Sequence, residues 1–333
     1  MAGPVGRIGP FRATGTVGVR STAPLPGRPL ATTETVLELS GLMRRFGDIT
    51  ALDGVSFSVA PGQMFGFVGP NGAGKTTTMR IVLGVLEPDA GTVRWRGREI
   101  DAATRARFGY MPEERGLYPK MRVRDQLAYF ARLHRLGGPA ATAAANRLIE
   151  RLGLEARAGN RVETLSLGNQ QRVQLGVALV HEPEVLVLDE PFSGLDPVGV
   201  DVLSGVLQER ARAGVPVVFS SHQLELVERL CEAVAIVNHG RVVATGAVEQ
   251  LRERGRDGRH VRVHVAGDGD GRWLHSVPGA ELVEAGPRGV LVRLRDDADP
   301  DRVLDAARSA GTVTHFSLER PTLSDLFRAA VTA

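Results

Sequence analysis

The interpretation of this sequence begins at one short stretch, Gly69-Pro70-Asn71-Gly72-Ala73-Gly74-Lys75-Thr76. An apolar run that ends at Val68 precedes it, and a stretch of helical character starts at Thr76. Glycine lets successive backbone N–H groups turn toward one point, and the N-terminus of a following helix adds positive potential. The stretch therefore predicts a phosphate-binding loop between a strand and a helix.

The spacing of the glycines, the lysine and the hydroxyl in this loop is that of the Walker A motif. Lys75 is expected to reach the β and γ phosphates of a nucleotide, and the Thr76 hydroxyl to bind Mg²⁺. A dinucleotide-binding loop is disfavoured, because Thr77 occupies the place of the third glycine in that fingerprint. We expect residues 69–77 to bind the phosphates of a nucleotide.

A second motif consists of two carboxylates at the end of an apolar run, Val185-Leu186-Val187-Leu188-Asp189-Glu190. Side chains alternate along a strand, so the adjacent acids can do different work. Asp189 suits the Mg²⁺ shell, and Glu190 can polarise or orient an attacking water. Paired acids at a strand end are also common on protein surfaces, and alone this motif decides little.

Working outward, the chain alternates strand-like and helical segments, which indicates an α/β fold with a mostly parallel sheet covered by helices. Between Val123 and about Arg161 the pattern is helical, which predicts a helical insert over about 123–180. A charged, glycine-bearing linker over 252–260 is followed by the pattern of a small α+β domain. Its last helix is expected to begin near Thr322, with Asp325 completing a capping box. The strand-like segments are 36–39, 55–59, 63–68, 93–95, 185–188, 215–220 and 234–237, and later 260–266, 289–295 and 312–318.

Between the two motifs lies Leu165-Ser166-Leu167-Gly168-Asn169-Gln170-Gln171-Arg172, which resembles the LSGGQ signature of ATP-binding cassette (ABC) proteins. Leu167 and Asn169 depart from the pattern, whereas Ser166 and Gly168 match it. The resemblance implies that the signature, Leu165 to Gln170, contacts the γ-phosphate of ATP held by a second subunit.

Further landmarks follow in the order of that family, over about residues 35 to 250. Phe46 matches the aromatic residue that stacks on adenine, and His222 matches the switch histidine. The segment Ser193-Gly194-Leu195-Asp196 is similar to the D-loop. Taken singly, Phe46 is more often a core residue and His222 more often a structural one.

One departure lies where the family usually has the glutamine of the Q-loop, because this chain has Glu113 there. Glu113 can offer an oxygen to Mg²⁺, yet it adds negative charge near the γ-phosphate. The surrounding stretch resembles ATP-binding subunits of ABC-2-type exporters, including sodium and drug or antibiotic exporters. So does the C-terminal domain that ends in the segment 321–327, and export is therefore expected rather than import.

The resemblance implies a mechanism in which two copies meet head to tail with ATP and Mg²⁺ between them. A separate polytopic permease would be moved by the dimer at the cytoplasmic face of the membrane, through a contact near residues 115–121. The alternative is a soluble ABC ATPase acting on ribosomes or DNA, although the second cassette or long coiled coil of such proteins is absent. A small-molecule kinase would leave the signature and His222 unexplained.

Composition bounds these interpretations. The net charge is only +3, and the sequence has no block of basic residues interleaved with aromatic residues, so no nucleic-acid partner is expected. No apolar stretch reaches the roughly 18–20 residues of a membrane helix, and the single cysteine, Cys231, excludes an internal disulfide. Residues 1–34 are expected to be a disordered extension, because they carry arginine, glycine and proline without periodicity. The predicted division is then a cassette over 35–252 and an accessory domain over 253–333.

Overall fold

The computed structural model describes residues 36–114, 116–254, 259–267, 270–286, 289–295, 298–319 and 322–332. The predicted disordered extension, 1–34, lies outside the described residues. No helix in the described ranges combines the length and apolar character that crossing a membrane requires.

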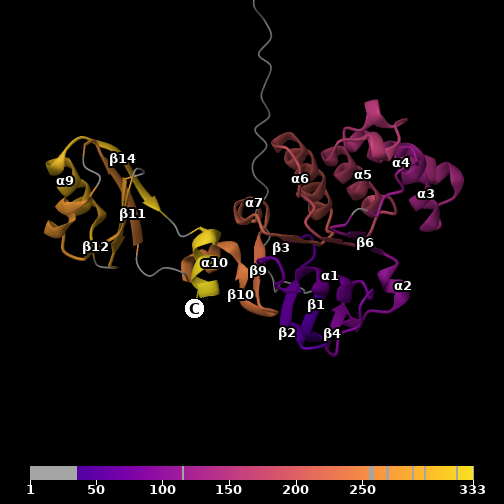
Figure 1. The fold of residues 1–333 in the computed structure, drawn as a ribbon, viewed down its shortest axis with the longest axis horizontal. Coiled ribbons are helices and arrows are strands. Elements are labelled where there is room, and N and C mark those ends of the chain that lie inside the picture. The colour runs from indigo at the N-terminus through magenta and orange to yellow at the C-terminus, as the bar shows by residue number, and fades with distance from the viewer. Residues whose placement is uncertain are drawn as a thin grey trace, which may run out of the picture. The chain divides into compact units, whose positions relative to one another are not determined.

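The central element is a six-stranded sheet in the order β10-β9-β3-β8-β7-β6 (Figure 1). Strands β9, β3, β8, β7 and β6 are parallel, and β10 pairs with β9 in the antiparallel sense. The carboxyl ends of parallel strands meet at one edge of a sheet, which is where ligands bind in folds of this kind. This confirms the predicted mostly parallel sheet. The strands are β3 (Met64–Val68), β6 (Phe108–Met111), β7 (Val185–Leu188), β8 (Val217–Ser221), β9 (Ala233–Asn238) and β10 (Arg241–Ala247).

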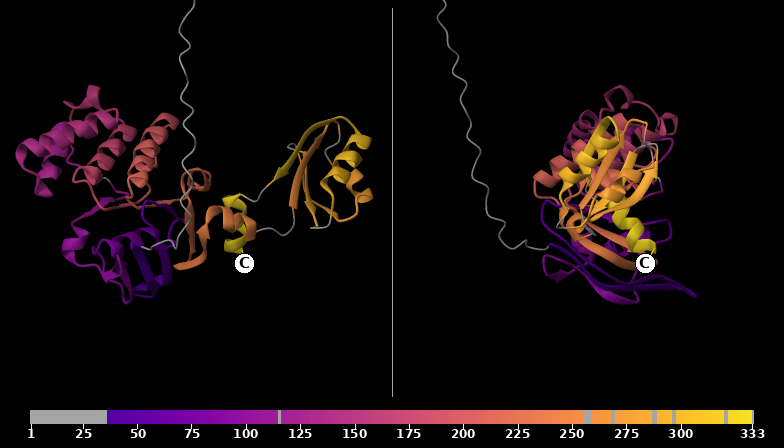
Figure 2. Two further views of the ribbon diagram at one scale, coloured as in Figure 1. Left: turned by 180° about the vertical axis from the view of Figure 1, so that it is seen from behind. Right: turned by 90° about the vertical axis from the view of Figure 1, so that its left-hand side faces the viewer.

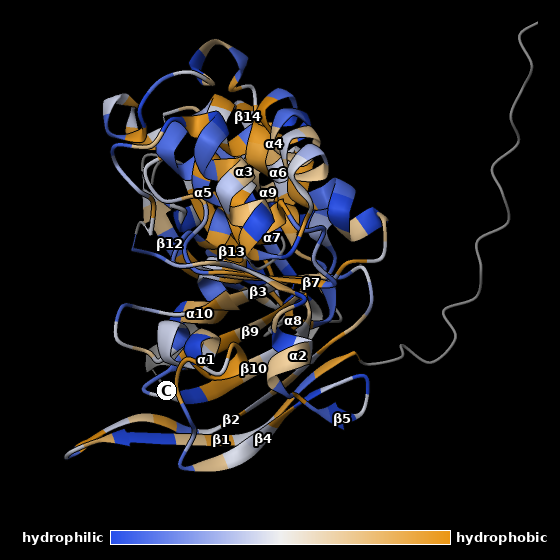
Figure 3. Ribbon diagram, turned by 90° about the vertical axis from the view of Figure 1, so that its right-hand side faces the viewer, coloured by the Kyte–Doolittle hydropathy of each residue, from blue (hydrophilic) through white to orange (hydrophobic). Residues whose placement is uncertain are grey.

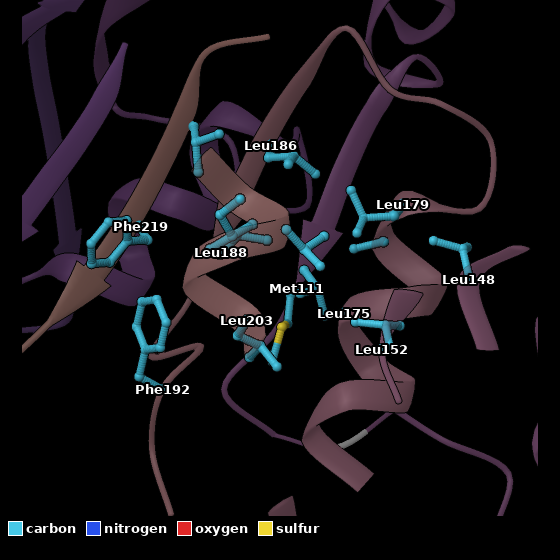
Figure 4. Close-up of a cluster of buried hydrophobic side chains, with 14 of the residues drawn as sticks. Met111, Leu148, Leu152, Leu175, Leu179, Leu186, Leu188, Phe192, Leu203 and Phe219 are labelled. Atoms are coloured by element: carbon cyan, nitrogen blue, oxygen red, sulfur yellow. The ribbon is translucent and has the colours of Figure 1, made fainter. Parts of the chain in front are cut away.

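Each buried strand of this sheet contributes side chains to two separate hydrophobic cores, because its side chains alternate between the two faces of the sheet. In β7, Leu186 and Leu188 join one core, whereas Val185 and Val187 join the other. Figure 4 shows the first core, where Phe219 lies beside Phe192, and Leu175 and Leu179 of helix α5 (Leu167–Leu179) lie on the other side of Leu188. Burial on both faces explains why these strands are continuous apolar runs.

The second core is closed by an antiparallel sheet in the order β2-β1-β4-β5. Along β2, Val55, Phe57 and Val59 are buried, whereas the serines between them are exposed, as expected for a sheet with one solvated face. The sequence pattern predicted part of β1, β2 and β4 but missed β5, and it did not separate these strands from the parallel sheet. Their bounds are β1 (Leu37–Phe46), β2 (Ile49–Val59), β4 (Ala90–Trp95) and β5 (Arg98–Glu99).

Helices cover both faces of the parallel sheet. Figures 1 and 2 show α3 to α6 on one face, and α1 with the antiparallel sheet on the other. Figure 3 shows the contrast in character between the hydrophobic strand β9 and the hydrophilic edge strand β5. Residues 123–180 hold helices α3, α4 and α5 with two short 3-10 turns. The helix bounds are α1 (Lys75–Val82), α2 (Ala102–Arg105), α3 (Val123–Leu133), α4 (Gly138–Arg151), α6 (Pro197–Arg212), α7 (Leu224–Leu230) and α8 (Val248–Arg254).

After α8 the chain forms a small antiparallel sheet in the order β12-β13-β11-β14. Its core consists of alternating valines of β11 and β13, closed by Val303 and Ala307 of helix α9 (Pro300–Ala310). The strands are β11 (Arg259–Val265), β12 (Ala280–Gly286), β13 (Gly289–Leu294) and β14 (Val313–Glu319).

Two expectations for this region were wrong. The predicted linker over 252–260 is partly regular, because α8 extends to Arg254 and β11 begins at Arg259, with 255–258 outside the described residues. Strands β10 and β12 were missed, and both lie at an edge of their sheet with half-buried or exposed side chains, which leave little apolar pattern to detect. Strand β6, earlier in the chain, was missed as well, although it is buried, because it has only four residues.

The last helix, α10 (Leu323–Thr332), starts as predicted. The Thr322 N–H donates to Asp325 Oδ2 at 2.9 Å, and the Asp325 N–H donates to Thr322 Oγ1 at 3.2 Å. This reciprocal pair is the capping box. Leu323 is fully buried in the core that holds α7, and its N–H donates to Glu228 Oε2 at 3.2 Å.

A pair of stacked histidines gives the fold a pH dependence. The His134 and His181 rings lie 3.6 Å apart and almost parallel, and His181 Nε2 contacts the Phe108 carbonyl at 3.2 Å. That bond assigns the neutral tautomer with its proton on Nε2, and the buried Nδ1 has no partner among the described groups. Burial, followed by the charge of His134, lowers the pKa of His181 to about 4.

We expect acid to destabilise the fold through His181. The unfolded chain binds this proton below a pKa of about 6.5 and the folded chain only near 4, so stability falls as pH decreases between these values. The loss is about 2 kcal/mol after allowing for the partly exposed ring. Urea unfolding at pH 7 and pH 5 measures the part of this loss that falls between those two pH values. His181→Gln should flatten the pH dependence, whereas His275→Gln, at an exposed site, should not; an unchanged slope in His181→Gln contradicts the assignment.

Candidate functional site

A cavity of about 320 Å³ opens at the carboxyl edge of the parallel sheet. It gathers residues that are more than a hundred positions apart, because β3, β6 and β7 all end there. Nine of the predicted site residues line it, together with Ala51 of β2. The lining residues are Ala51, Asn71, Gly72, Gly74, Lys75, Thr76, Thr77, Glu113, Asp189 and Glu190.

The loop between β3 and α1 needs glycine for identifiable reasons. Gly74 has φ of +102° immediately before α1, and a Cβ there would lie 2.6 Å from the Ala51 carbonyl oxygen. A Cβ on Gly69 would lie 2.3 Å from the carbonyl oxygen of Val237 in β9. The loop is therefore pressed between β2 and β9, and its shape is set by these strands.

Lys75 folds back over this loop. Its Nζ donates to the carbonyls of Gly69 and Pro70 at 2.8 and 3.2 Å, and lies 3.8 Å from Glu190 Oε1. The side chain is nearly buried at 8% exposure, so its charge acts in a medium of lower dielectric than water. The ammonium has three donors, and two go to carbonyls, which leaves one for an anion in the cavity.

Asp189 is placed for a hard cation. It is fully buried, its Oδ1 accepts the Ser220 hydroxyl at 2.6 Å, and its Oδ2 has no hydrogen-bond partner in the described part of the chain. Thr76 and Glu113 line the same cavity with further oxygens. Such an oxygen set, together with phosphate oxygens and waters, suits Mg²⁺.

Glu190 stands between a cation and a histidine. Its Oε2 lies within hydrogen-bonding distance of His222 Nδ1, at 3.0 Å. Its Oε1 lies 3.8 Å from Lys75 Nζ and has no hydrogen-bond partner among the described residues. The φ of Glu190 is +49°, a left-handed conformation that costs a residue with a side chain about 1–3 kcal/mol. Buried strain of this sort points to a functional carboxylate.

His222 directly follows β8 and reaches Glu190 without lining the cavity itself. Its side chain is 53% exposed. Phe46 ends β1 with 46% exposure, and the Arg44 guanidinium lies 4.9 Å from its ring centre. The alternative that Phe46 is a core residue is therefore wrong.

The predicted signature lies at the start of α5, apart from the cavity lining. Ser166 caps the helix, with its Oγ accepting the Asn169 N–H at 3.4 Å, and Leu167 is 55% exposed. Leu165 is buried, and the Gln170 amide donates to the Val162 and Leu165 carbonyls at 3.1 and 3.2 Å. Leu165 and Gln170 thus hold the turn, while Ser166 and Gly168 form its outer side.

The predicted D-loop connects the two regions. The Ser193 N–H donates to the Glu190 carbonyl at 3.1 Å, and Gly194 has φ of +72°. Leu195 packs beside Gly168, whose Cβ would lie 3.4 Å from the leucine. Asp196 caps α6 by accepting the Gly199 N–H at 2.6 Å.

Sequence reasoning missed several residues that build the site. Ser220 joins Asp189 to the Glu190 backbone, and Ala51 supplies the wall beside the loop. Gln171 donates to the Glu190 and Pro191 carbonyls at 3.3 and 3.0 Å, and Gln174 donates to the Pro112 carbonyl at 2.5 Å. Two signals in the sequence could have indicated them. Gln171 and Gln174 are polar residues in a helix without a clear polar face, and Ser220 and Ser221 end an otherwise apolar strand.

Comparisons with known proteins match both parts of the chain. Residues 52–193 match the ABC transporter family, and residues 246–331 match the family described as ATP-binding protein DrrA1-3-like, C-terminal domain. An uncharacterised ABC transporter ATP-binding protein of Bacillus subtilis is 39% identical over 292 residues, covering 88% of this chain and 97% of its own. The Nod factor export ATP-binding protein I of Ralstonia nicotianae is 37% identical over 317 residues, covering 91% and 95%.

Solved structures give the same result. An ATP-binding subunit of an ABC transporter is 31% identical with a TM-score of 0.61, covering 66% of this chain and 93% of its own. A Clostridium perfringens protein described as part of an ABC transporter complex is 27% identical with a TM-score of 0.60, covering 66% and 92%. The chain belongs to the family of ABC transporter ATP-binding proteins, and it is an ATPase of the P-loop fold whose ATP hydrolysis energises transport through a membrane partner.

Proposed function

We propose that this chain is the ATPase subunit of an ABC-2-type exporter, and that it works as a head-to-tail homodimer beneath a separate permease at the cytoplasmic face of the membrane. The observation that carries the proposal is one cavity that joins the Walker loop, Asp189 and Glu190, with the signature outside its lining. Export is favoured by the DrrA1-3-like match over 246–331 and by a relative described as a Nod factor export protein.

Within this proposal, residues 69–77 bind the ATP phosphates and Phe46 stacks on adenine. Thr76, Asp189 and Glu113 hold Mg²⁺, which neutralises phosphate charge when bound. Glu190 takes the proton of the attacking water, and His222, 3.0 Å from its Oε2, keeps the carboxylate oriented. Lys75 contributes positive charge beside the transferred phosphoryl group.

The second half of each ATP site would come from the other subunit. Ser166 and Gly168 stand at the exposed N-terminus of α5, where the helix dipole favours an anion. Neither residue reaches the cavity of its own chain. Ser193 to Asp196 would then lie at the subunit interface, next to Gly168.

The permease contact is proposed for residues 115–121 and the neighbouring part of α3; Arg115 itself is outside the described residues. Tyr118 and Tyr129 are 47% and 38% exposed, and their ring centres lie 5.6 Å apart. Partly exposed aromatic clusters are typical of protein interfaces. The division into a cassette over 35–252 and an accessory domain over 253–333 is also proposed.

Affinity purification of the tagged chain from detergent-solubilised membranes of its native host tests this proposal. A polytopic membrane protein should co-purify in stoichiometric amount, and reconstitution with it should stimulate ATP hydrolysis. Double substitution of Tyr118 and Tyr129 by serine should weaken that stimulation without changing the basal rate. Purification with ribosomes or DNA instead would support the soluble ABC ATPase and contradict transport.

A further inference from the structure

The site contains a buried hydroxyl that the ATPase mechanism described so far does not use. Ser220 is the fourth residue of β8 and is fully buried. Its Oγ donates to Asp189 Oδ1 at 2.6 Å and accepts the Glu190 N–H at 2.8 Å. One hydroxyl therefore contacts both acids of the site, from a neighbouring strand.

Each of the two bonds fixes a different property of the site. The bond to Asp189 occupies Oδ1, so that Oδ2 is the oxygen left for a ligand. The bond to the Glu190 N–H acts on a residue with φ of +49°. A left-handed conformation persists only where neighbouring groups hold it.

The Glu190 backbone is held on its other side as well. Gln171, buried in α5, donates to the Glu190 carbonyl at 3.3 Å and to the Pro191 carbonyl at 3.0 Å. The peptide units on both sides of Glu190 are thereby fixed, and its carboxylate is directed between Lys75 and His222. Without these bonds the chain can relax, and the carboxylate would leave that position.

We propose that Ser220 is a positioning residue for ATP hydrolysis, which orients Asp189 toward Mg²⁺ and holds Glu190 in its strained conformation. The inference rests on the proposed metal role of Asp189. Ser220→Ala should lower kcat by about ten- to a hundredfold, because two buried partners of the hydroxyl, one of them charged, lose their hydrogen bond. The KM for MgATP should rise by about tenfold, because Asp189 no longer directs Oδ2 to the metal, whereas the contacts of the loop with the phosphates are unchanged.

A binding measurement separates this role from a general loss of activity. In the Glu190→Gln background, which is expected to hydrolyse ATP only slowly, ATP affinity is titrated with Mg²⁺ and with EDTA. Ser220→Ala should leave the ATP affinity in EDTA unchanged. It should reduce the Mg²⁺ gain, which is the ratio of the ATP affinity with Mg²⁺ to that in EDTA, by about tenfold. Ser220→Thr, which keeps the hydroxyl, should restore most of the gain. Ser204→Ala is the matched control, because Ser204 is a buried serine of α6 whose hydroxyl has no partner among the described residues.

Ser220→Cys keeps the inference testable if the alanine variant does not fold, because a thiol is a weak donor and acceptor and should give an intermediate loss. A full Mg²⁺ gain and normal kcat in a folded Ser220→Ala protein would overturn the positioning role. Asp189→Asn distinguishes a failure of the inference about Ser220 from a failure of the proposed metal role of Asp189. If Asp189→Asn abolishes the Mg²⁺ gain while Ser220→Ala keeps it, only the inference about Ser220 fails; if Asp189→Asn also keeps it, the metal role of Asp189 is wrong.

Discussion

Replacing Glu190 with Gln should reduce ATP turnover by about a hundred- to ten-thousandfold, the usual range for the loss of a general base. Glutamine keeps the size of the side chain and removes the negative charge that lies 3.0 Å from His222 and 3.8 Å from Lys75. ATP binding should remain, because residues 69–77 are untouched. The ATP-bound dimer should therefore accumulate, which sedimentation in the presence of ATP would show alongside the rate measurement.

The exposed Glu99 offers a matched control, since Glu99→Gln makes the same chemical change outside the cavity lining. It should hydrolyse ATP at the normal rate and stay monomeric or dimeric as the parent does. Hydrolysis at a near-normal rate in Glu190→Gln would mean that another group activates the water.

Replacing Lys75 with Ala should weaken ATP binding by about tenfold to a hundredfold and abolish turnover, because charged hydrogen bonds are each worth about 1.5–3 kcal/mol. Two effects add here. The phosphates lose a cation, and the carbonyls of Gly69 and Pro70 lose the ammonium that draws the loop together. Titration with a fluorescent ATP analogue measures the affinity.

The chain contains one other lysine, which makes the control direct. Lys120 is exposed and lies outside the cavity lining, so Lys120→Ala should bind and hydrolyse ATP normally. Thermal unfolding of Lys75→Ala should stay close to the parent, since the two hydrophobic cores of the cassette are untouched. Unchanged ATP affinity in a folded Lys75→Ala protein would break the Walker assignment.

Much of this site was predictable from sequence, because it depends on backbone groups that particular residues make possible. A glycine loop before a lysine, and two acids after an apolar strand, each follow from local chemistry. The parallel sheet then brings them together at one edge without further information. The signature, His222 and Phe46 came only from family resemblance, since a lone serine, histidine or phenylalanine has no chemical pattern of its own.

What sequence could not supply was the tertiary hydrogen bonding. Ser220 gains its role from a neighbouring strand, and Gln171 gains its role from the way α5 meets the end of β7. The same limit applies to strands β10 and β12, whose side chains are half-buried or exposed and give little apolar pattern along the sequence. The division of the first strands into a separate sheet also required knowledge of strand pairing.

Subunit mixing tests most directly the claim that each ATP lies between the Walker loop of one copy and the signature of another. Ser166→Arg and Lys75→Ala homodimers should both be inactive, because neither contains a site with both halves intact. A mixed dimer has one such site, formed by the Walker loop of the first variant and the signature of the second. We predict that ATPase activity returns on mixing and that parent activity falls on dilution. Activity that stays constant at limiting dilution, with no recovery in the mixture, would contradict the head-to-tail site.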